Sequence, residues 1–362
     1  MNPLFELIQY SLGTRDDFPS APDSVETWKA LLQQVAEHSL VGITFPAIRK
    51  MSTTGAVPVE IYYPWEVAVR KIISKNQWQR KAVAELYHLF LDNGFRNCIL
   101  KGQAAANYYP KPFLRQSGDI DIWLEGSRET IMAFLRSRYE VYKTRYIHCE
   151  AKVLDNVRVE VHFTPSWMFS PFANRRLQRW FASRSDGQFS HFDNSLGCNV
   201  PTTDFNAVYM LLHIYRHVME EGIGLRQLLD YYYVLKRMDE TGRKTVVRDL
   251  KQLRLYRFAG AVMFVLRSSF LADESILLCP PDARLGTILL ESILESGNFG
   301  HSDPVFANPD SKTEGILAHG WRKIKRNLRY LLLSPSEVLW MPWFVTWQYF
   351  WRRKHGYLYK GR

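Results

Sequence analysis

The chain has 362 residues, of which 46% are hydrophobic and 23% are charged, and its formal net charge is +11. This length predicts about two or three packed units, and the composition excludes a disordered or collagen-like protein. The segment 321–362 alone carries +9 of the net charge, so the rest of the chain is nearly neutral and nucleic acid is not an expected partner.

Residues 1–94 are expected to form an N-terminal helical region. Ser24 is a candidate N-cap, and apolar residues at helical spacing follow it in the segment 25–40. A longer run of such residues spans 65–91, and Asn93-Gly94 is expected to end that helix. We interpret the region as a packing bundle that carries no chemistry.

The segment 95–200 is expected to form an α+β core. A short strand over 97–100 runs into a turn at Lys101-Gly102 and a short helix over 103–107. A second strand over 119–124 alternates strictly between polar and apolar residues. A helix over 127–139 follows, and then a meander of strands over 140–148, 151–154 and 156–163. This order of elements predicts the α+β class.

Helices are expected to return in a C-terminal helical region over 201–320. Amphipathic segments begin near residue 203 and include predicted helices over 245–255 and 258–271. The segment 272–313 is richer in Gly, Pro, Asp and Ser, and residues 298–313 are expected to be a loop.

The remaining residues, 321–362, form a basic and aromatic tail. Trp340, Trp343, Trp347 and Trp351 recur at helical spacing, basic residues follow them directly, and Pro342 suits the first turn of a helix. One interpretation is an interfacial helix over 339–354 that makes a peripheral contact with a membrane. The other is a helix docked on the core or on a partner chain. Stacking on RNA is a third use of such residues, but no RNA-module motif accompanies them.

Acidic residues on two of the predicted strands are the sharpest chemical feature. A strand places Asp119 and Asp121 on one face, where two carboxylates can share one or two divalent cations. A solvated pair at a sheet edge is the alternative without function. Glu160, on another alternating strand, can supply a third carboxylate. These three carboxylates, an anion-binding turn at Lys101-Gly102 and Arg115 are the groups that metal-assisted phosphoryl or nucleotidyl transfer requires.

A longer pattern carries a family resemblance. The stretch LKGQAAANYYPKPFLRQSGDIDIWL, followed by VRVEVHF, resembles the uncharacterised bacterial nucleotidyltransferases of the DNA-polymerase-beta-like superfamily. The similarity covers roughly residues 25–240 and continues through the segments 213–217 and 224–230. It implies a small mixed β-sheet, of nucleotidyltransferase type, flanked by N-terminal and C-terminal helical regions.

The resemblance also implies roles for individual residues. Asp119 and Asp121 would hold Mg²⁺ against the triphosphate of an NTP, and Glu160 would be the third catalytic acid, on a second Mg²⁺ ion. Contacts with the nucleotide are implied for a further set of residues, namely Lys101, Gly102, Arg115, Gly118, His162 and Arg226. The wider superfamily usually has Gly-Ser at the phosphate turn, whereas Gln103 follows Gly102 here. Phosphate contact would therefore rest on backbone N–H groups, Lys101 or Arg115.

The implied reaction moves a nucleoside monophosphate from an NTP to a hydroxyl or phosphate group and releases pyrophosphate. The acceptor could be a small molecule, a sugar or a protein. A nucleotide-binding or scaffolding module is one alternative, suggested by Gln103, and an RNA-tailing enzyme is another, suggested by the basic tail. His213 and His217, four residues apart on a helix, are interpreted as packing or hydrogen-bonding residues rather than zinc ligands. Arg226 and Asp230 are expected to form a helix salt bridge.

Cysteine spacing and the N-terminus bear on location. The four cysteines form no C-x-x-C pair, which argues against a disulfide framework and against a thiolate zinc site. The N-terminus lacks the pattern of a secretory signal, and no apolar run reaches about 18 residues. We therefore expect a cytoplasmic protein, peripheral at the membrane if the tail binds lipid.

Overall fold

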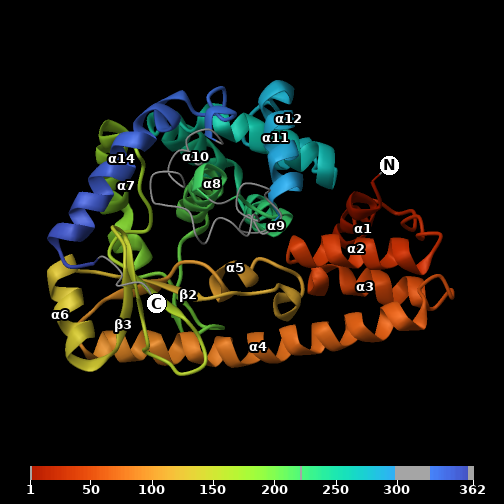
Figure 1. Cartoon of the computed structure of the whole chain (residues 1–362), viewed down its shortest axis with the longest axis horizontal. Helices are drawn as coiled ribbons and strands as arrows, with labels where there is room; N and C mark the ends of the chain where they lie inside the picture. Colours follow the sequence, from red (N-terminus) through yellow and green to blue (C-terminus); the bar gives the residue numbers. More distant parts are fainter. Residues whose placement is uncertain (1, 221, 298–326, 358–362) are drawn as a thin grey trace.

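The computed structural model describes residues 2–220, 222–297 and 327–357, and it combines a small five-stranded sheet and a two-stranded sheet with many helices (Figure 1). The α+β class expected from the sequence is confirmed. The helices of the N-terminal and sheet regions are α1 Pro3–Leu12, α2 Val25–Glu37, α3 Val41–Ser52, α4 Val59–Asp92, α5 Gln103–Ala106, the 3₁₀ turn η1 Pro112–Leu114 and α6 Arg128–Arg138. The later helices are α7 Pro171–Gln188, α8 Thr203–Glu220, α9 Leu225–Lys236, α10 Glu240–Gln252, α11 Tyr256–Phe270, the 3₁₀ turn η2 Glu274–Ile276, α12 Ala283–Ser296 and α14 Pro335–Lys354.

The N-terminal region is helical as predicted, and α4 joins it to the sheet. This helix runs along the lower edge of the molecule in Figure 1, from α2 and α3 to the strands. Trp65 of α4 is buried, and its indole N–H donates to the carbonyl of Val41 on α3 over 2.9 Å. The helix predicted over 65–91 is confirmed, although it begins earlier, at Val59, and ends before Gly94, whose positive φ of 83° suits glycine.

Five strands form a mixed sheet in the order β1-β2-β5-β4-β3. Their bounds are β1 Asn97–Ile99, β2 Ile120–Leu124, β3 Val141–Thr144, β4 His148–Ala151 and β5 Val159–His162. The central pair, β2 and β5, is parallel, and the other three pairs are antiparallel. A separate two-stranded sheet pairs β6 Phe192–Asp193 with β7 Cys198–Asn199.

The two faces of the sheet differ as the alternation predicts. Apolar residues of β2 and β5 pack against α4 and α6 in one buried cluster that includes Ile120, Ile122, Val159 and Val161. Trp123, from the opposite face, belongs to the other cluster, where it stacks with Phe205 of α8. Asp121 and Glu160 share the face of Trp123. The sheet thus points its charged residues toward the C-terminal helices.

The predicted meander has different boundaries in the structure. The chain reverses between Thr144 and His148, so the strand expected over 140–148 is wrong, and so is a separate strand over 151–154. β4 takes its place because Cys149 and Ala151 enter the apolar cluster while His148 and Glu150 face the other way. The last strand starts at Val159 rather than at residue 156.

The C-terminal region is helical as expected, and one further helix lies in a segment whose composition is typical of loops. α12 occupies residues 283–296, inside the segment rich in Gly, Pro, Asp and Ser. Its N-cap is Asp282, whose carboxylate accepts from the N–H of Leu285 over 3.0 Å. Helices predicted over 245–255 and 258–271 correspond to α10 and α11. The loop expected over 298–313 lies outside the described residues.

The aromatic tail forms the helix α14, and one side of it is docked on the molecule. The helix begins at Pro335, so Pro342 lies inside it rather than in its first turn. Val338, Met341 and Phe344 are buried against the core, and other aromatic residues of the helix contact Phe172 of α7 and Tyr146. This side of α14 is therefore docked on the core, as one of the two interpretations of the tail predicts.

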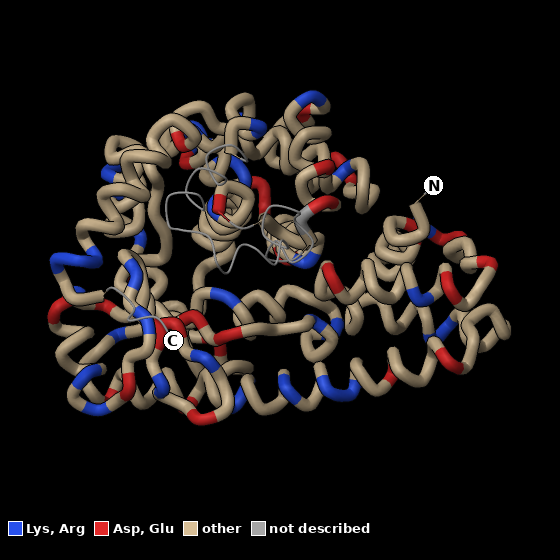
Figure 2. The backbone as a smooth tube through the Cα atoms, in the orientation of Figure 1, with Lys and Arg blue, Asp and Glu red and all other residues tan. Residues whose placement is uncertain are grey.

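The other side of α14 is apolar and exposed. Leu339, Trp343 and Phe350 are 67%, 72% and 58% exposed, and they lie near one line along the helix. Figure 2 shows basic positions at the C-terminal end of the helix, which are Arg352, Arg353 and Lys354. None of the helices in the described part of the chain is long and apolar enough to cross a membrane.

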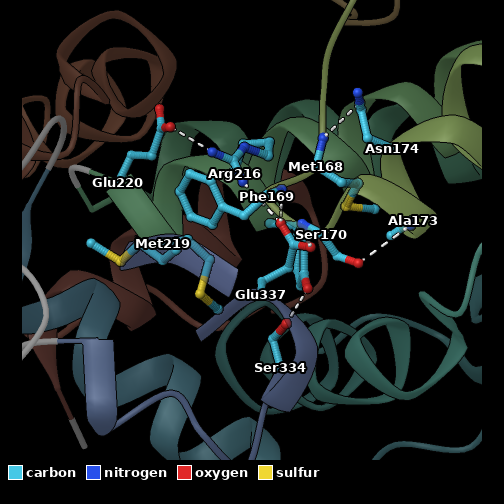
Figure 3. A network of polar contacts seen from close by, with 12 residues as sticks. Met168, Phe169, Ser170, Ala173, Asn174, Arg216, Met219, Glu220, Ser334 and Glu337 are labelled. Atoms are coloured by element: carbon cyan, nitrogen blue, oxygen red, sulfur yellow. Dashed lines mark hydrogen bonds and ion pairs between the residues drawn. The ribbon is translucent and has the colours of Figure 1, made fainter. Parts of the chain in front are cut away.

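A buried carboxylate fixes the start of α14. Glu337 is 1% exposed and accepts hydrogen bonds from the backbone N–H groups of Phe169 and Ser170 (Figure 3). It also pairs with Arg216 of α8 over 3.2 Å, and Arg216 in turn pairs with Glu220. We call this group the Glu337 anchor. It ties the tail to the start of α7 and to α8.

Candidate active site

The three predicted acids meet on the polar face of the central parallel strands. Asp121 of β2 lies opposite Glu160 of β5, and Glu160 lies opposite Glu150 of β4. Asp119 directly precedes β2. Figure 2 shows acidic and basic positions side by side around these strands. The carboxylates therefore form a row across the sheet instead of lying on separate surfaces.

A cavity of about 650 Å³ lies over this row. Its volume is in the range of small-molecule and cofactor sites. All nine residues that the sequence singled out as catalytic or nucleotide-contacting line it: Lys101, Gly102, Arg115, Gly118, Asp119, Asp121, Glu160, His162 and Arg226. The structure brings the predicted residues together, although they come from β2, β5, α9 and the loops around α5 and η1.

Side chains of α4 hold the loop that leads into Asp119. The amide of Asn76 donates to the carbonyls of Phe113 and Arg115, each over 2.8 Å. The amide of Gln79 donates to the carbonyl of Gly118 over 2.7 Å. These bonds are buried or partly buried, so the long helix fixes the backbone just before the first aspartate.

Asp121 is the best-neutralised acid of the row. It is 2% exposed, and its Oδ1 lies 2.8 Å from Nζ of Lys101 and 3.0 Å from Nε2 of His162. Burial opposes ionisation of the carboxyl, but Lys101 and His162 outweigh it and lower the pKa of Asp121. Lys101 therefore faces a carboxylate in this structure.

Asp119 has the opposite balance. Burial, together with the charges of Asp121 and Glu160, raises the pKa of its carboxyl to about 6, and Lys101 only partly opposes this. Carboxylates crowded in one site disfavour each other's ionisation. An added cation would relieve that repulsion, so of the three acids Asp119 would be stabilised most by a bound cation.

Glu160 lies between two imidazoles. Its Oε2 is 3.4 Å from Nδ1 of His148 and 3.7 Å from Nε2 of His162. Burial opposes ionisation of Glu160, but the hydrogen bond from His162 and the charges around it lower its pKa well below the usual range. Burial lowers the pKa of His148 to about 3, so that imidazole is neutral at neutral pH.

Arg115 is bound within the fold. Its Nε and Nη2 reach the two oxygens of Asp230 over 2.6 and 2.7 Å, and its Nη1 donates to the carbonyl of Gly102 over 3.2 Å. Such a bidentate pair is strong and geometrically specific. Asp230 also accepts from the hydroxyl of Tyr109. The expected helix salt bridge between Arg226 and Asp230 is wrong, because Arg115 takes the carboxylate.

Arg226 is left with a different set of contacts. Its Nη1 donates to the carbonyl of Gln116 over 2.6 Å, and its Nε, although buried, has no partner in residues 2–220, 222–297 and 327–357. Burial and the nearby charge of Arg115 lower the pKa of this guanidinium. A buried cation that lines a cavity and lacks a carboxylate suits an anionic ligand.

The turn at Gly102 has the backbone that its glycine allows. Gly102 has φ 62°, in the left-handed region, and a side chain there would be strained. Gln103, which stands in place of the usual serine, is 2% exposed and donates to Asn76 and Gln79 on α4. Gln103 is therefore a packing residue of the turn, and its side chain does not line the cavity.

Several cavity residues escaped the sequence reasoning. They are mainly basic or imidazole side chains, including Lys75, Lys143, His148, Arg145, Arg158 and Arg216. His148 could have been found from the alternation of β4 if the chain reversal before it had been placed. The cations on other elements carry no local signal, because only the tertiary fold turns them toward the acids.

His213 and His217 also line the cavity, from α8. Their ring centroids lie 4.2 Å apart, and burial lowers the pKa of both, that of His217 to about 4. Among the residues that the structure describes, the one group arranged to hold a metal ion through at least three His, Cys, Asp or Glu side chains is His148, Glu160 and His162.

Comparisons with known proteins agree with the family expected from the motif. The family described as "Uncharacterised nucleotidyltransferase" matches residues 24–270, which is more than half of the chain. A solved structure, titled as an antigenic nucleotidyltransferase-like protein from Paracoccidioides brasiliensis, is 14% identical, with 57% of this chain and 95% of that chain covered. Its TM-score is 0.31. No curated protein matches the chain.

Proposed function

This chain belongs to the family of uncharacterised nucleotidyltransferases, and we propose that it transfers a nucleoside monophosphate from an NTP to a hydroxyl or phosphate group, releasing pyrophosphate. The observation that carries the proposal is the row of acids in one cavity. Asp119, Asp121 and Glu160 line it together, and the pKa of Asp119 is raised by burial and by the other two. Carboxylates kept in such mutual repulsion are typical of functional sites.

The donor set fits magnesium. Mg²⁺ prefers oxygen ligands and is usually bound through one or two carboxylates together with substrate phosphates. Asp119 and Asp121 would hold the ion, with Glu160 beside a second one. Bound there, Mg²⁺ would neutralise charge on the triphosphate and lower the pKa of the acceptor hydroxyl. Glu160 suits the role of a cation ligand better than that of a proton acceptor, because its pKa is lowered.

The cationic lining supports a polyphosphate as the other ligand. Arg226 presents a buried guanidinium whose Nε has no acceptor in the described part of the chain. Lys75, Arg145 and Arg158 line the same cavity from three other segments. Arg115 would contribute indirectly, since it holds the carbonyl of Gly102 and thereby the turn. A cytoplasmic location belongs to the same proposal, and the free, buried state of all four cysteines fits a reducing compartment.

The position of Lys101 supports one alternative function, a nucleotide-binding module without transfer activity. Its ammonium lies 2.8 Å from Asp121 and neutralises carboxylate charge that a divalent cation would otherwise neutralise. A nucleotide-binding module without transfer activity would keep this ion pair, whereas a transferase must loosen it when Mg²⁺ binds.

The proposal is tested with the purified full chain, Mg²⁺, each of the four NTPs labelled at the α-phosphate, and cell extract. Transfer of label to a small molecule, a sugar, a protein or RNA identifies the acceptor, and label on RNA would mean a tailing enzyme. The Asp119→Asn variant should transfer no label. Mg²⁺-dependent NTP binding without transfer would replace the proposal with the nucleotide-binding module. Absence of both binding and transfer would contradict both.

A further inference from the structure

His148 is a buried imidazole that the proposed transfer does not use. It is 7% exposed, and neither of its ring nitrogens has a hydrogen-bond partner among the described residues. Buried polar groups are nearly always paired, because an unpaired one costs about 1–3 kcal/mol. An unpaired, buried imidazole that lines a cavity indicates that a ligand binds there.

The atoms around His148 form a triangle of metal-binding size. Nδ1 of His148 and Nε2 of His162 lie 3.4 and 3.7 Å from the same oxygen, Oε2 of Glu160. One ligand atom from each residue falls within 4.8 Å of the others. A tetrahedral ion with bonds of about 2.0–2.1 Å holds its ligands roughly 3.3 Å apart, which is close to these two distances.

The sheet sets the direction of these side chains. His148 and His162 are directly opposite residues of β4 and β5, and both line the cavity. Nδ1 of His162 lies 3.4 Å from the carbonyl oxygen of Thr164, so the ring turns its Nε2 toward Asp121 and Glu160, which lie 3.0 and 3.7 Å away. A carbonyl behind the non-ligating nitrogen is the usual support of a metal-bound imidazole. Ligands on paired strands are also held more firmly than ligands on loops.

We propose that His148, Glu160 and His162 bind a divalent transition-metal ion of the zinc type. Two imidazole nitrogens and one carboxylate oxygen favour Zn²⁺ or Co²⁺ over Mg²⁺, which takes oxygen ligands and keeps several waters. Oδ1 of Asp121, 3.0 Å from Nε2 of His162, is the nearest further donor. The inference extends beyond the proposed function: it assigns the cation position beside Glu160 to this ion instead of a second Mg²⁺, and the chain alone holds the ion without NTP.

The binding test uses Co²⁺ and Zn²⁺ on the full chain after chelator treatment. We expect one equivalent of Co²⁺ to give the visible absorption of a low-symmetry, nitrogen-ligated site, and Zn²⁺ to displace it. Excess Mg²⁺ should leave the absorption unchanged. The His148→Gln variant should bind at least tenfold more weakly. The matched control is His88→Gln, which changes an exposed histidine on α4 and should bind as the wild type does.

A second measurement decides the matter if His148→Gln fails to fold. Zinc-edge X-ray absorption of the Zn²⁺-loaded wild-type chain should show two imidazole ligands with Zn–N distances of about 2.0 Å. No stoichiometric binding, a first shell without imidazole, or equal affinity of the His148→Gln variant would overturn the inference. Zn²⁺ binding in a protein that transfers no nucleotide would sustain it while the proposed function fell. Transfer without Zn²⁺ binding would do the reverse.

Discussion

The Glu337 anchor and the acid row of the cavity are both groups of buried carboxylates, and their surroundings differ. Glu337 receives two backbone N–H bonds and one arginine, Arg216. Asp119 meets two further carboxylates, Asp121 and Glu160, which add to the effect of burial on its pKa. Burial also raises the pKa of Glu337, but there Arg216 and the two backbone N–H groups oppose the rise, and the charge of Glu220 adds to it.

The surroundings of a buried acid indicate whether it is structural. A buried carboxylate whose partners match its charge and its lone pairs stabilises the fold, and removing it leaves a buried cation without its partner. A row of carboxylates that repel one another stabilises nothing by itself and suits an added cation. Loss of Glu337 should therefore damage stability, whereas loss of Asp119 should damage function.

The largest effect is expected from the acid row. Asp119→Asn should lower the rate of nucleotide transfer at least about a thousandfold, or about 4 kcal/mol, because the metal-holding charge is lost. The measurement is the initial rate with labelled NTP and the identified acceptor, beside a circular dichroism spectrum that should match the wild type. A variant that keeps a tenth of the activity would show that Asp119 is not a metal ligand.

The Glu337 anchor should respond in stability. Glu337→Gln is expected to reduce the free energy of unfolding by about 2 kcal/mol, because two buried N–H groups and Arg216 lose a charged acceptor. Glu220 still pairs with Arg216 and limits the loss. Denaturant unfolding measures this. The matched control is Glu240→Gln, whose exposed pair with Lys244 should be worth less than about 0.5 kcal/mol. Equal effects of the two variants would mean that the anchor is not structural.

The comparison predicts a pH dependence for the metal-free protein. The pKa of Asp119 is about 6 when folded and about 3.8 when unfolded, so the folded state binds more protons between these values. Asp119 should therefore contribute a fall in stability of at most about 3 kcal/mol as pH rises from about 4 to 6. The buried His148 and His217, whose pKa values are lowered to about 3 and about 4, bind fewer protons when folded and contribute a rise over the same range, so the net stability should rise with pH. Thermal unfolding in EDTA across this range measures it. The rise should be steeper in Asp119→Asn, which lacks the opposing contribution, and an unchanged slope would exclude a raised pKa at Asp119.

The smallest effect on the fold concerns the outward side of α14. We propose that Leu339, Trp343 and Phe350, next to the basic end of the helix, contact an anionic membrane surface. Trp343→Ser should leave the melting temperature within a degree or two and weaken sedimentation with anionic vesicles. Trp78→Ser, on the exposed side of α4, is the control and should change neither. Absence of vesicle binding by the wild type at low salt would refute the contact.

Local patterns predicted a large part of the fold and the site. Alternation over 119–124 and 157–163 separated the apolar face from the acids, because strand side chains point to opposite faces in turn. Spacing also predicted the N-terminal helices, and the motif resemblance predicted which residues line the cavity. The parallel pairing that sets Asp121 opposite Glu160 was not predicted, since a strand sequence does not specify its neighbour and the resemblance implies only a mixed sheet.

The remaining features depend on long-range contacts. His148 was missed because the reversal before β4 has no strong turn residue, so the first strand of the meander was expected to continue from residue 140 to 148. Glu337 looked like the sole acid of a basic tail, yet it is buried by residues more than a hundred positions away. Asp230 pairs with Arg115 rather than with Arg226, although only Arg226 is close in sequence. In each case the decisive partner lies on another element.

The most direct test of the central claim, that the acid row is a cation site, compares melting temperatures of the wild type and Asp119→Asn with and without Mg²⁺ and NTP. We predict that Mg²⁺ with NTP stabilises the wild type by several degrees and leaves Asp119→Asn unchanged. Without ligand, the variant should melt at the same temperature or higher, because one of the repelling charges is gone. A variant that melts well below the wild type without ligand, beside a wild type that Mg²⁺ and NTP do not stabilise, would show that the acids are structural.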